Sequence, residues 1–375
     1  MKFKIIFLYT LLISCYSCAQ VTENKKENDI PITESSAYDY EVIVPDLIVP
    51  WGLEFLPDGS MLITEQRGEL IHYKNGQKQI IAGVPEVYYR GQGGLMDIKI
   101  SPDYSKTGWI YFTYSSTEGA GKGGNTALMR AKLNSRKLTE KEVLYKATPN
   151  TTKGQHFGSR IVFDNQDHVY FTIGERGNRD ENPQDIKRDG GKVYRLNLDG
   201  SIPSDNPFVG KENAMEAIWS YGHRNPQGMD INPTTGEIWV HEHGPRGGDE
   251  INIIRKAANY GWPVITYGIN YSGTSITDQT SKKGMEQPFY YWVPSIAPSG
   301  MAFISSDKYP QLKDNLLVGS LKFLYLEAVY IDKNKVIKRE KLLDGVGRVR
   351  NVKQGPDGSI YLGVEGRGIL KLIKK

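Results

Sequence analysis

The feature of this sequence that most constrains its fold is a unit that recurs six times. Each copy has an apolar run, a turn and a second apolar run, as in WGLEFLPDGSMLITE and SRIVFDNQDHVYFTIGE. The turns carry Pro, Asn, Asp and Gly, which are the residues that tight β-hairpins use. We therefore expect six hairpins. The copies begin at Trp51, Gly94, Ser159, Gly228, Gly300 and Arg350.

A third strand-like segment follows each hairpin, for example GELIHYK after the first and GILKLIKK at the C-terminus. The 40 glycines and 23 tyrosines fit many short strands joined by tight turns. One such sheet cannot cover both of its faces, but sheets packed around an axis cover each other. The sequence predicts an all-β fold, a six-bladed β-propeller. YEVIVPDLIV, from Tyr40 to Val49, would complete the last blade and close the ring.

The N-terminal segment has the pattern of an export signal. MKFKIIFLYTLLISCYSCAQ combines two lysines, an apolar run and small residues, and the apolar run is too short to span a bilayer. LISC resembles a lipoprotein box with Cys15 as the lipidated residue; lipidation at Cys18 and plain cleavage after Ala19 are the alternatives. We expect an exported protein of the periplasm or outer membrane. Its expected parts are a signal (residues 1–19), a polar tether (20–39) and the propeller (40–375).

Charge and cysteine content exclude some classes of protein. The formal net charge is +4, with 47 Lys and Arg against 43 Asp and Glu. Such a nearly neutral chain has no electrostatic footprint for nucleic acid. Both cysteines lie in the signal, so we expect no internal disulfide in the mature chain.

Hairpin geometry predicts where the chemistry lies. The residue before the first strand of a hairpin and the residue after the second strand lie at the same end, and the turn lies at the other end. Across the six copies, basic, acidic and carboxamide residues stand at the end opposite the turn. The end with the turn carries mostly Asp, Asn, Gly and Pro. Polar groups that converge on one end of a propeller are typical of a functional site. The set comprises Gln92, His156, Glu175, Arg224, Asn225, Lys322, Arg348 and Arg350.

His156 is the candidate base of this rim. A lone loop histidine is usually structural, but Glu175 follows the second strand of the same hairpin and would return to the same end. There it would orient the ring and stabilise the imidazolium. His168 lies beside the turn at the opposite end. His241 and His243 share a strand face without an evident third metal ligand.

The four basic residues of the rim would suit a small polyanion, because guanidinium groups pair well with carboxylates. Pairing with local acids such as Glu242, Asp344 and Glu365 is the alternative, and spacing alone does not separate the two. The glycine-rich stretch HGPRGGDEIN carries Asp249 and Glu250. Its carbonyls and carboxylates are oxygen ligands of the kind that Ca²⁺ takes, although such loops commonly bind no metal.

Several motifs resemble, in the same order, those of the soluble quinoprotein glucose and aldose sugar dehydrogenases. They are PWGLEFLPDG, GQGGLMDIKISPDY, GQHFGSRIVF, GHRNPQGMDI, HGPRGGDEIN and NYGWP. The likeness extends from about Ile43 to the C-terminus. It implies a six-bladed propeller that uses pyrroloquinoline quinone (PQQ) and Ca²⁺. PQQ is a tricarboxylate, which would account for the basic rim.

The resemblance also implies roles for individual residues. His156 matches the base that takes the proton of the sugar hydroxyl, and Glu175 matches the acid that orients it. Arg224 would act with Ca²⁺ to stabilise charge on the quinone oxygen. Cofactor contacts are implied for Gln92, Arg224, Asn225, Lys322, Arg348 and Arg350. Calcium contacts are implied for the carbonyls of Gly244 and Pro245 and, at a further site, for Glu250 and Tyr260.

The implied reaction is the oxidation of an aldose to a lactone, with hydride passing to the quinone and an external acceptor reoxidising it. Two positions depart from the pattern of the best-known glucose enzymes: Gln155 replaces an acid, and Glu175 replaces an aspartate. We therefore expect a broad aldose preference. The loops after NYGWP are short, so both a monomer and a dimer remain open.

Two other classes remain to be tested. Some six-bladed propellers are calcium-dependent lactonases or related hydrolases, whose single metal is held by Asn, Asp and Glu side chains. Here Arg and Lys stand at those rim positions. A propeller can also be a non-catalytic module that binds sugar or protein, because the fold alone does not decide function.

Overall fold

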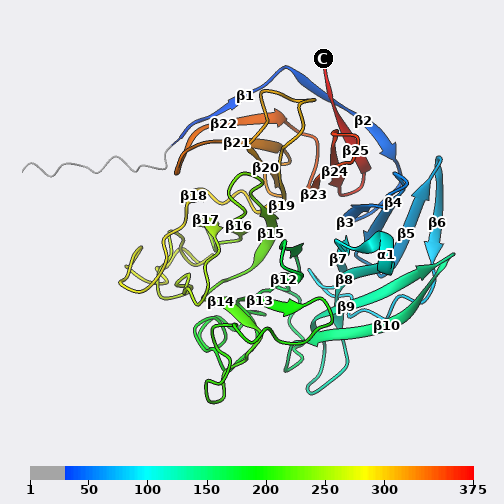
Figure 1. Cartoon of the computed structure of the whole chain (residues 1–375). Coiled ribbons are helices and arrows are strands. Elements are labelled where there is room, and N and C mark those ends of the chain that lie inside the picture. Colours follow the sequence, from blue (N-terminus) through cyan, green and yellow to red (C-terminus); the bar gives the residue numbers. More distant parts are fainter. Residues whose placement is uncertain (1–29) are drawn as a thin grey trace, which may run out of the picture.

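In the computed structural model, which describes residues 30–375, the chain folds into six β-sheets arranged around a central axis (Figure 1). Each predicted hairpin forms the first two strands of one sheet, and each predicted third segment forms the next strand. The first strand of every sheet lies innermost, where it contacts the first strands of the neighbouring sheets. The predicted all-β, six-bladed propeller is confirmed.

The blades follow the chain in order. Blade 1 comprises β3 (Pro50–Phe55), β4 (Met61–Glu65), β5 (Glu69–Lys74) and β6 (Gln77–Ile81). Blade 2 comprises β7 (Leu95–Ile100), β8 (Trp109–Ser116), β9 (Asn125–Asn134) and β10 (Lys137–Lys146), with the short helix α1 (Tyr104–Thr107) between β7 and β8. Blade 3 comprises β11 (Ile161–Phe163), β12 (His168–Ile173), β13 (Lys192–Asn197) and β14 (Ile218–Tyr221).

The second half of the ring repeats this plan. Blade 4 comprises β15 (Pro226–Ile231), β16 (Ile238–Glu242), β17 (Asp249–Ile253) and β18 (Tyr290–Trp292). Blade 5 comprises β19 (Pro298–Phe303), β20 (Leu316–Ser320), β21 (Leu326–Asp332) and β22 (Lys335–Leu343), joined by β1 (Ile32–Glu34). Blade 6 comprises β23 (Val349–Gln354), β24 (Ile360–Val364), β25 (Gly368–Lys374) and β2 (Tyr38–Val44).

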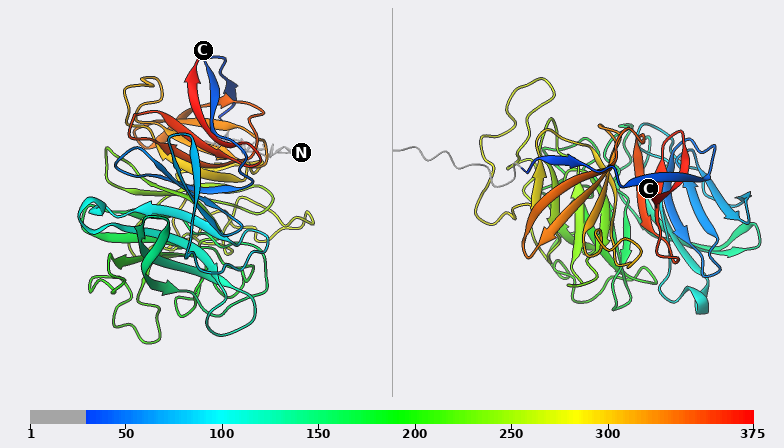
Figure 2. Two further views of the ribbon diagram at one scale, coloured as in Figure 1. Left: turned by 90° about the vertical axis from the view of Figure 1, so that its right-hand side faces the viewer. Right: turned by 90° about the horizontal axis from the view of Figure 1, so that it is seen from above.

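The N-terminal strand closes the ring as expected. β2 pairs antiparallel with β25 and so supplies the fourth strand of blade 6; Figure 2 shows the two side by side. β1 pairs in parallel with β22, so strand structure begins at Ile32, inside the segment 20–39 that the sequence predicts as a tether. The predicted signal and residues 20–29 lie outside the described residues. Within the described part, no helix is long and apolar enough to cross a membrane.

The hydrophobic core lies between the blades. Alternate side chains of a strand point to opposite faces of its sheet. In β12, Val169 and Phe171 pack toward blade 2, whereas Tyr170 packs toward blade 4. Every pair of neighbouring blades encloses one such cluster. Each sheet is therefore buried on both faces, which holds the strand ends that carry the polar rim in fixed positions.

Arg160 lies beside the axis and connects four inner strands to the start of blade 3. Its side chain is 5% exposed and pairs with Asp97 of β7 at 3.2 Å. The same guanidinium donates to main-chain carbonyls of Trp51 (3.5 Å), Gln227 (2.7 Å) and Arg350 (2.7 Å) on β3, β15 and β23. Burial lowers the pKa of Arg160 to about 10, which still leaves it charged at neutral pH.

Candidate active site

His156 and Glu175 form a largely buried pair on one rim of the propeller, as the hairpin argument predicts. His156 precedes β11 and Glu175 follows β12, and Nδ1 of the imidazole is hydrogen-bonded to Oε1 of the carboxylate. The His156 side chain is 13% exposed and that of Glu175 is 2% exposed. A carboxylate that accepts the Nδ1 proton leaves Nε2 as the basic nitrogen.

The surroundings of His156 keep its ring neutral. Burial is the main cause that lowers the pKa of His156, and the nearby charge of Arg224 lowers it further. The hydrogen bond and negative charge of Glu175 oppose both effects. The net pKa lies below the ordinary value of 6.5, so the imidazole is available as a base at neutral pH.

A cavity of about 350 Å³ opens above this pair. His156, Glu175, Arg224 and Pro245 line it, together with Trp262. The rest of its lining comes from three loops, whose members are Lys153, Gly177, Asn178, Arg179, Asp180, Asn270 and Tyr271. The size and the mixture of two aromatic side chains, Trp262 and Tyr271, with several polar groups fit a small polar ligand.

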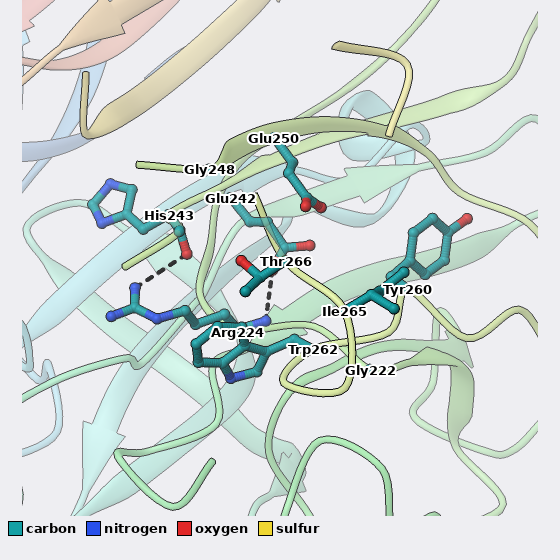
Figure 3. Close-up of a pocket in the computed structure, with 11 residues that line it drawn as sticks. Gly222, Arg224, Glu242, His243, Gly248, Glu250, Tyr260, Trp262, Ile265 and Thr266 are labelled. Carbon is teal, nitrogen blue, oxygen red and sulfur yellow. Dashed lines mark hydrogen bonds between the residues drawn. The ribbon is translucent and has the colours of Figure 1, made fainter. Parts of the chain in front are cut away.

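Arg224 lines both this cavity and a smaller one, whose residues Figure 3 shows. Its main-chain N–H donates to Glu242 at 2.6 Å, and its guanidinium donates to the His243 carbonyl at 3.1 Å. The guanidinium carbon lies 5.3 Å from the centre of the Trp262 ring. Within residues 30–375, the buried Nε of Arg224 has no hydrogen-bond partner. An unpartnered buried donor of this kind is uncommon, and at Arg224 it lies beside two cavities, where a ligand could accept its hydrogen bond.

Gln92 and Asn225 hold the loop that carries His156. The side-chain oxygen of Gln92 accepts the His156 N–H at 2.8 Å and an Asn225 N–H at 3.3 Å. Asn225 in turn accepts the N–H of Gly158 at 3.2 Å. Two of the predicted cofactor contacts thus lie within hydrogen-bonding distance of the base or its loop.

The remaining basic residues lie on blades 5 and 6. Glu365 accepts hydrogen bonds from Arg348 at 2.6 Å and from Arg350 at 3.0 Å, so the pairing with a local acid that the sequence left open is present for these two. Arg350 is also 3.5 Å from Gln227, which bonds to Asn225. Lys322 is exposed, with its ammonium 4.9 Å from the Phe323 ring centre. Arg350 thus belongs to the hydrogen-bonded network around His156, and Lys322 stands apart from it.

The predicted calcium residues divide between the two cavities. Gly244, Glu250 and Tyr260 line the smaller one, of about 10 Å³, whereas Pro245 lines the larger one. The hydroxyl of Tyr260 donates to the Ile253 carbonyl at 2.6 Å and points away from the smaller cavity in Figure 3. Only its main chain would therefore face an ion there.

One buried and one half-buried carboxylate, Glu242 and Glu250, lie at the smaller cavity. Asn252 donates to both Glu242 and Glu250, at 3.1 Å each. Burial, and secondly the charge of Glu242, raises the pKa of Glu250 to about 8. In the described residues, no group of three or more His, Cys, Asp or Glu side chains is arranged to hold a metal, so an ion here would also need main-chain oxygens.

The sequence analysis missed a second buried histidine–glutamate pair. His223 Nδ1 lies 2.8 Å from Glu242 Oε1, and the ring stacks on Tyr260 with centroids 4.5 Å apart. The 19-residue spacing equals that of His156 and Glu175, and in both pairs the histidine precedes the first strand of a blade and the glutamate lies at or just after the end of the second. That repeated spacing was the available signal. Trp262, which lines both cavities, was also missed.

Comparison with known proteins identifies the family. Residues 47–372 match the family model described as Glucose / Sorbosone dehydrogenase. The chain belongs to this family. It is 43% identical over 330 residues to the aldose sugar dehydrogenase YliI of Escherichia coli, a match that covers 86% of this chain and 88% of the relative.

Solved structures of family members agree with the fold. The apo-form of the soluble aldose sugar dehydrogenase from Escherichia coli superposes with a TM-score of 0.87 at 40% identity, covering 90% of this chain and all of that one. The PQQ-bound aldose sugar dehydrogenase from Streptomyces coelicolor superposes with a TM-score of 0.74 at 25% identity, covering 92% and 100%. These relatives support an oxidoreductase that acts on sugars.

Proposed function

We propose that the protein oxidises aldose sugars to lactones with PQQ and Ca²⁺, using His156 as the general base. The observation that carries this proposal is the largely buried His156–Glu175 pair at a cavity that also contains Arg224, a buried cation with an unpartnered N–H. The family supplies the class of reaction, and the PQQ-bound relative supports the cofactor.

The residues at the cavity fit an anionic planar cofactor. The orphaned Nε of Arg224 needs an acceptor, and Trp262 offers an aromatic surface beside it. Outside the lining of that cavity, Gln92 and Asn225 offer amide groups beside the His156 loop, and Lys322, Arg348 and Arg350 carry positive charge on the rim, the two arginines paired with Glu365. These residues would hold PQQ. When bound, PQQ supplies the two-electron acceptor for the sugar, and an external acceptor then takes the electrons from the protein.

The protein's own contribution is to move a proton. Nε2 of His156 would take the proton of the anomeric hydroxyl, because Nδ1 is engaged by Glu175. The carboxylate of Glu175 would then stabilise the imidazolium, and its other oxygen, Oε2, is buried and has no hydrogen-bond partner among residues 30–375. The walls of the cavity would orient the sugar so that the same hydroxyl meets Nε2 in each turnover.

Calcium fits the oxygen donors near Arg224. The smaller cavity is the size of one ion or water molecule and has the carboxylates of Glu242 and Glu250 at its wall. We propose that Glu250 and the Tyr260 carbonyl hold one Ca²⁺ and that the carbonyls of Gly244 and Pro245 hold another beside the cofactor. Bound calcium would polarise a quinone oxygen.

Removal of calcium should lower thermal stability. A ligand that binds only the folded state at 100 times its Kd stabilises that state by about 2.7 kcal/mol. We expect Ca²⁺ added to chelator-treated protein to raise the midpoint of thermal unfolding, and Glu250→Gln to reduce the rise. Glu237→Gln, on an exposed turn of the same blade, is the matched control. An equal rise in the wild type and Glu250→Gln would rule out Glu250 as a ligand.

Reconstitution tests the proposed activity. Purified protein mixed with PQQ and Ca²⁺ should reduce an artificial redox dye when glucose, galactose or another aldose is added. We expect no reduction when PQQ or the sugar is omitted. Hydrolysis of a lactone without any electron acceptor would instead favour the calcium-dependent hydrolase class. Absence of both activities would favour a non-catalytic binding module.

The pH dependence should follow the charges around His156. The base must be neutral, so activity falls as the pH drops through the pKa of His156. Glu175 raises that pKa, and therefore Glu175→Gln should move the acid limb of the kcat/KM profile to lower pH. The plateau should fall by about 10²-fold because the imidazolium loses its partner. A limb that moves to higher pH would contradict the assignment of Glu175.

A further inference from the structure

Arg176, which directly follows Glu175, is fully buried at 0% exposure and was not singled out by the sequence. Its guanidinium lies over the ring of Phe157 at 3.4 Å from the centre. The hydrogen bonds of this guanidinium go almost entirely to main-chain oxygens. Its acceptors are the carbonyls of Gln155, Lys153 (2.9 Å) and Gly124 (3.2 Å) and the hydroxyl of Thr151 (3.4 Å).

A buried arginine without a carboxylate partner is unusual, because the cost of removing the charge from water is normally offset by an ion pair. Among the described residues, Arg176 forms no ion pair with any acid, and its Nε has no hydrogen-bond partner. Three of the four acceptors, in Thr151, Lys153 and Gln155, lie in the segment that leads directly into His156. The buried charge is therefore directed at the backbone that carries the candidate base.

His156 needs this support because its own backbone is unfavourable. Its φ of +59° lies in the left-handed region, which is uncommon for non-glycine residues. Glu175 holds the ring, and the main-chain N–H of Arg176 donates to the His156 carbonyl at 3.3 Å. Glu175 thus holds the His156 ring, and Arg176 holds the His156 carbonyl and the loop before it.

We propose that Arg176 is a positioning residue for the reaction: its guanidinium fixes the loop 151–157 so that the His156 ring faces the cavity, and its unpaired charge acts on that ring. This inference rests on the proposed function, in which His156 is the base. Three charged groups influence the pKa of the imidazole, namely Arg224, Glu175 and Arg176. Arg176 is the one that also holds the loop.

The first test uses the protein without added cofactor. Histidine-labelled protein is titrated by NMR, and the His156 signal is assigned from its loss in His156→Asn. In Arg176→Gln the midpoint of the His156 titration should move to higher pH, because a neighbouring cation favours the neutral ring. The matched control is Arg195→Gln, since Arg195 is also buried in blade 3 and lies over Trp219, but bonds to His168 near the other rim. It should leave the midpoint unchanged.

The second test uses enzyme reconstituted with PQQ and Ca²⁺ and assayed with glucose. Arg176→Gln should lower kcat by about 10²-fold, the effect of a small displacement of a reacting group, with KM changed less than about threefold. Arg176→Lys keeps a cation but not the fork of donors. Its His156 titration midpoint should therefore be near the wild-type value, whereas its kcat should remain reduced. If Arg176→Gln fails to fold, Arg176→Lys is used in its place in the kcat measurement.

The outcomes separate the two proposals. If Arg176→Gln leaves both the midpoint and kcat unchanged, or if Arg195→Gln shifts them equally, Arg176 is a structural residue only and the inference is overturned. If the wild type oxidises no sugar, the proposed function fails, but the NMR titration still decides whether Arg176 acts on His156.

Discussion

His156→Asn should abolish sugar oxidation while leaving the protein able to bind PQQ. A positioned general base contributes about 10²- to 10⁴-fold to a rate, so we expect kcat to fall by that factor. Asparagine is the suitable replacement because it tolerates the left-handed backbone that His156 adopts, and it keeps the main-chain N–H that Gln92 accepts. The measurement is dye reduction at saturating aldose, with PQQ binding followed separately by absorbance titration.

His168→Asn is the control for this prediction. His168 starts β12 at the opposite end of the same hairpin and pairs with Asp164 at 2.8 Å. Its replacement should leave kcat within about twofold, because it lies far along the strand from the base. If His156→Asn retained wild-type turnover, or if its loss of turnover were matched by a loss of PQQ binding, His156 would not be the base.

The ring of blades was predictable because it follows from local patterns. Apolar alternation and turn residues recur within each copy, and the same hairpin geometry returns Glu175 to the end where His156 begins. The strand that closes the ring was also predictable from the sequence. Tyr38–Val44 has the composition of a strand, and the last repeat has only three strands of its own. By contrast, β1 has the sequence ITE, with a single apolar residue, and its pairing with β22 depends on where the ring places that strand.

The charged residues that hold the site together were not predictable in the same way. Arg176 and Arg160 bind main-chain carbonyls, and a carbonyl is present at every residue, so no pattern of residue types marks their partners. The pairing of Arg348 and Arg350 with Glu365 was foreseen only as one of two possibilities. The sequence therefore indicates which residues reach the rim, whereas the contacts among them require the three-dimensional arrangement.

The replacement Arg160→Met should have the largest effect on stability. It would leave the Asp97 carboxylate, which is 3% exposed, without its cation and would remove hydrogen bonds to three inner strands. Breaking a buried pair by removing one partner costs about 3–5 kcal/mol. We expect a loss of that size in the free energy of unfolding, measured by chemical denaturation.

Two comparisons test the cause of this loss. Lys74 and Asp58 form an ion pair in which the side chains are 51% and 48% exposed. Lys74→Met breaks this pair and should cost at most about 1 kcal/mol. The double variant Asp97→Asn with Arg160→Met should cost less than the sum of the two single changes, because no unpaired buried charge remains. Simple additivity would mean that Arg160 stabilises the ring through its carbonyl contacts alone. The charge of Arg160 would then contribute nothing to the free energy of unfolding. The stabilisation at the axis would come from its hydrogen bonds to the neighbouring blades.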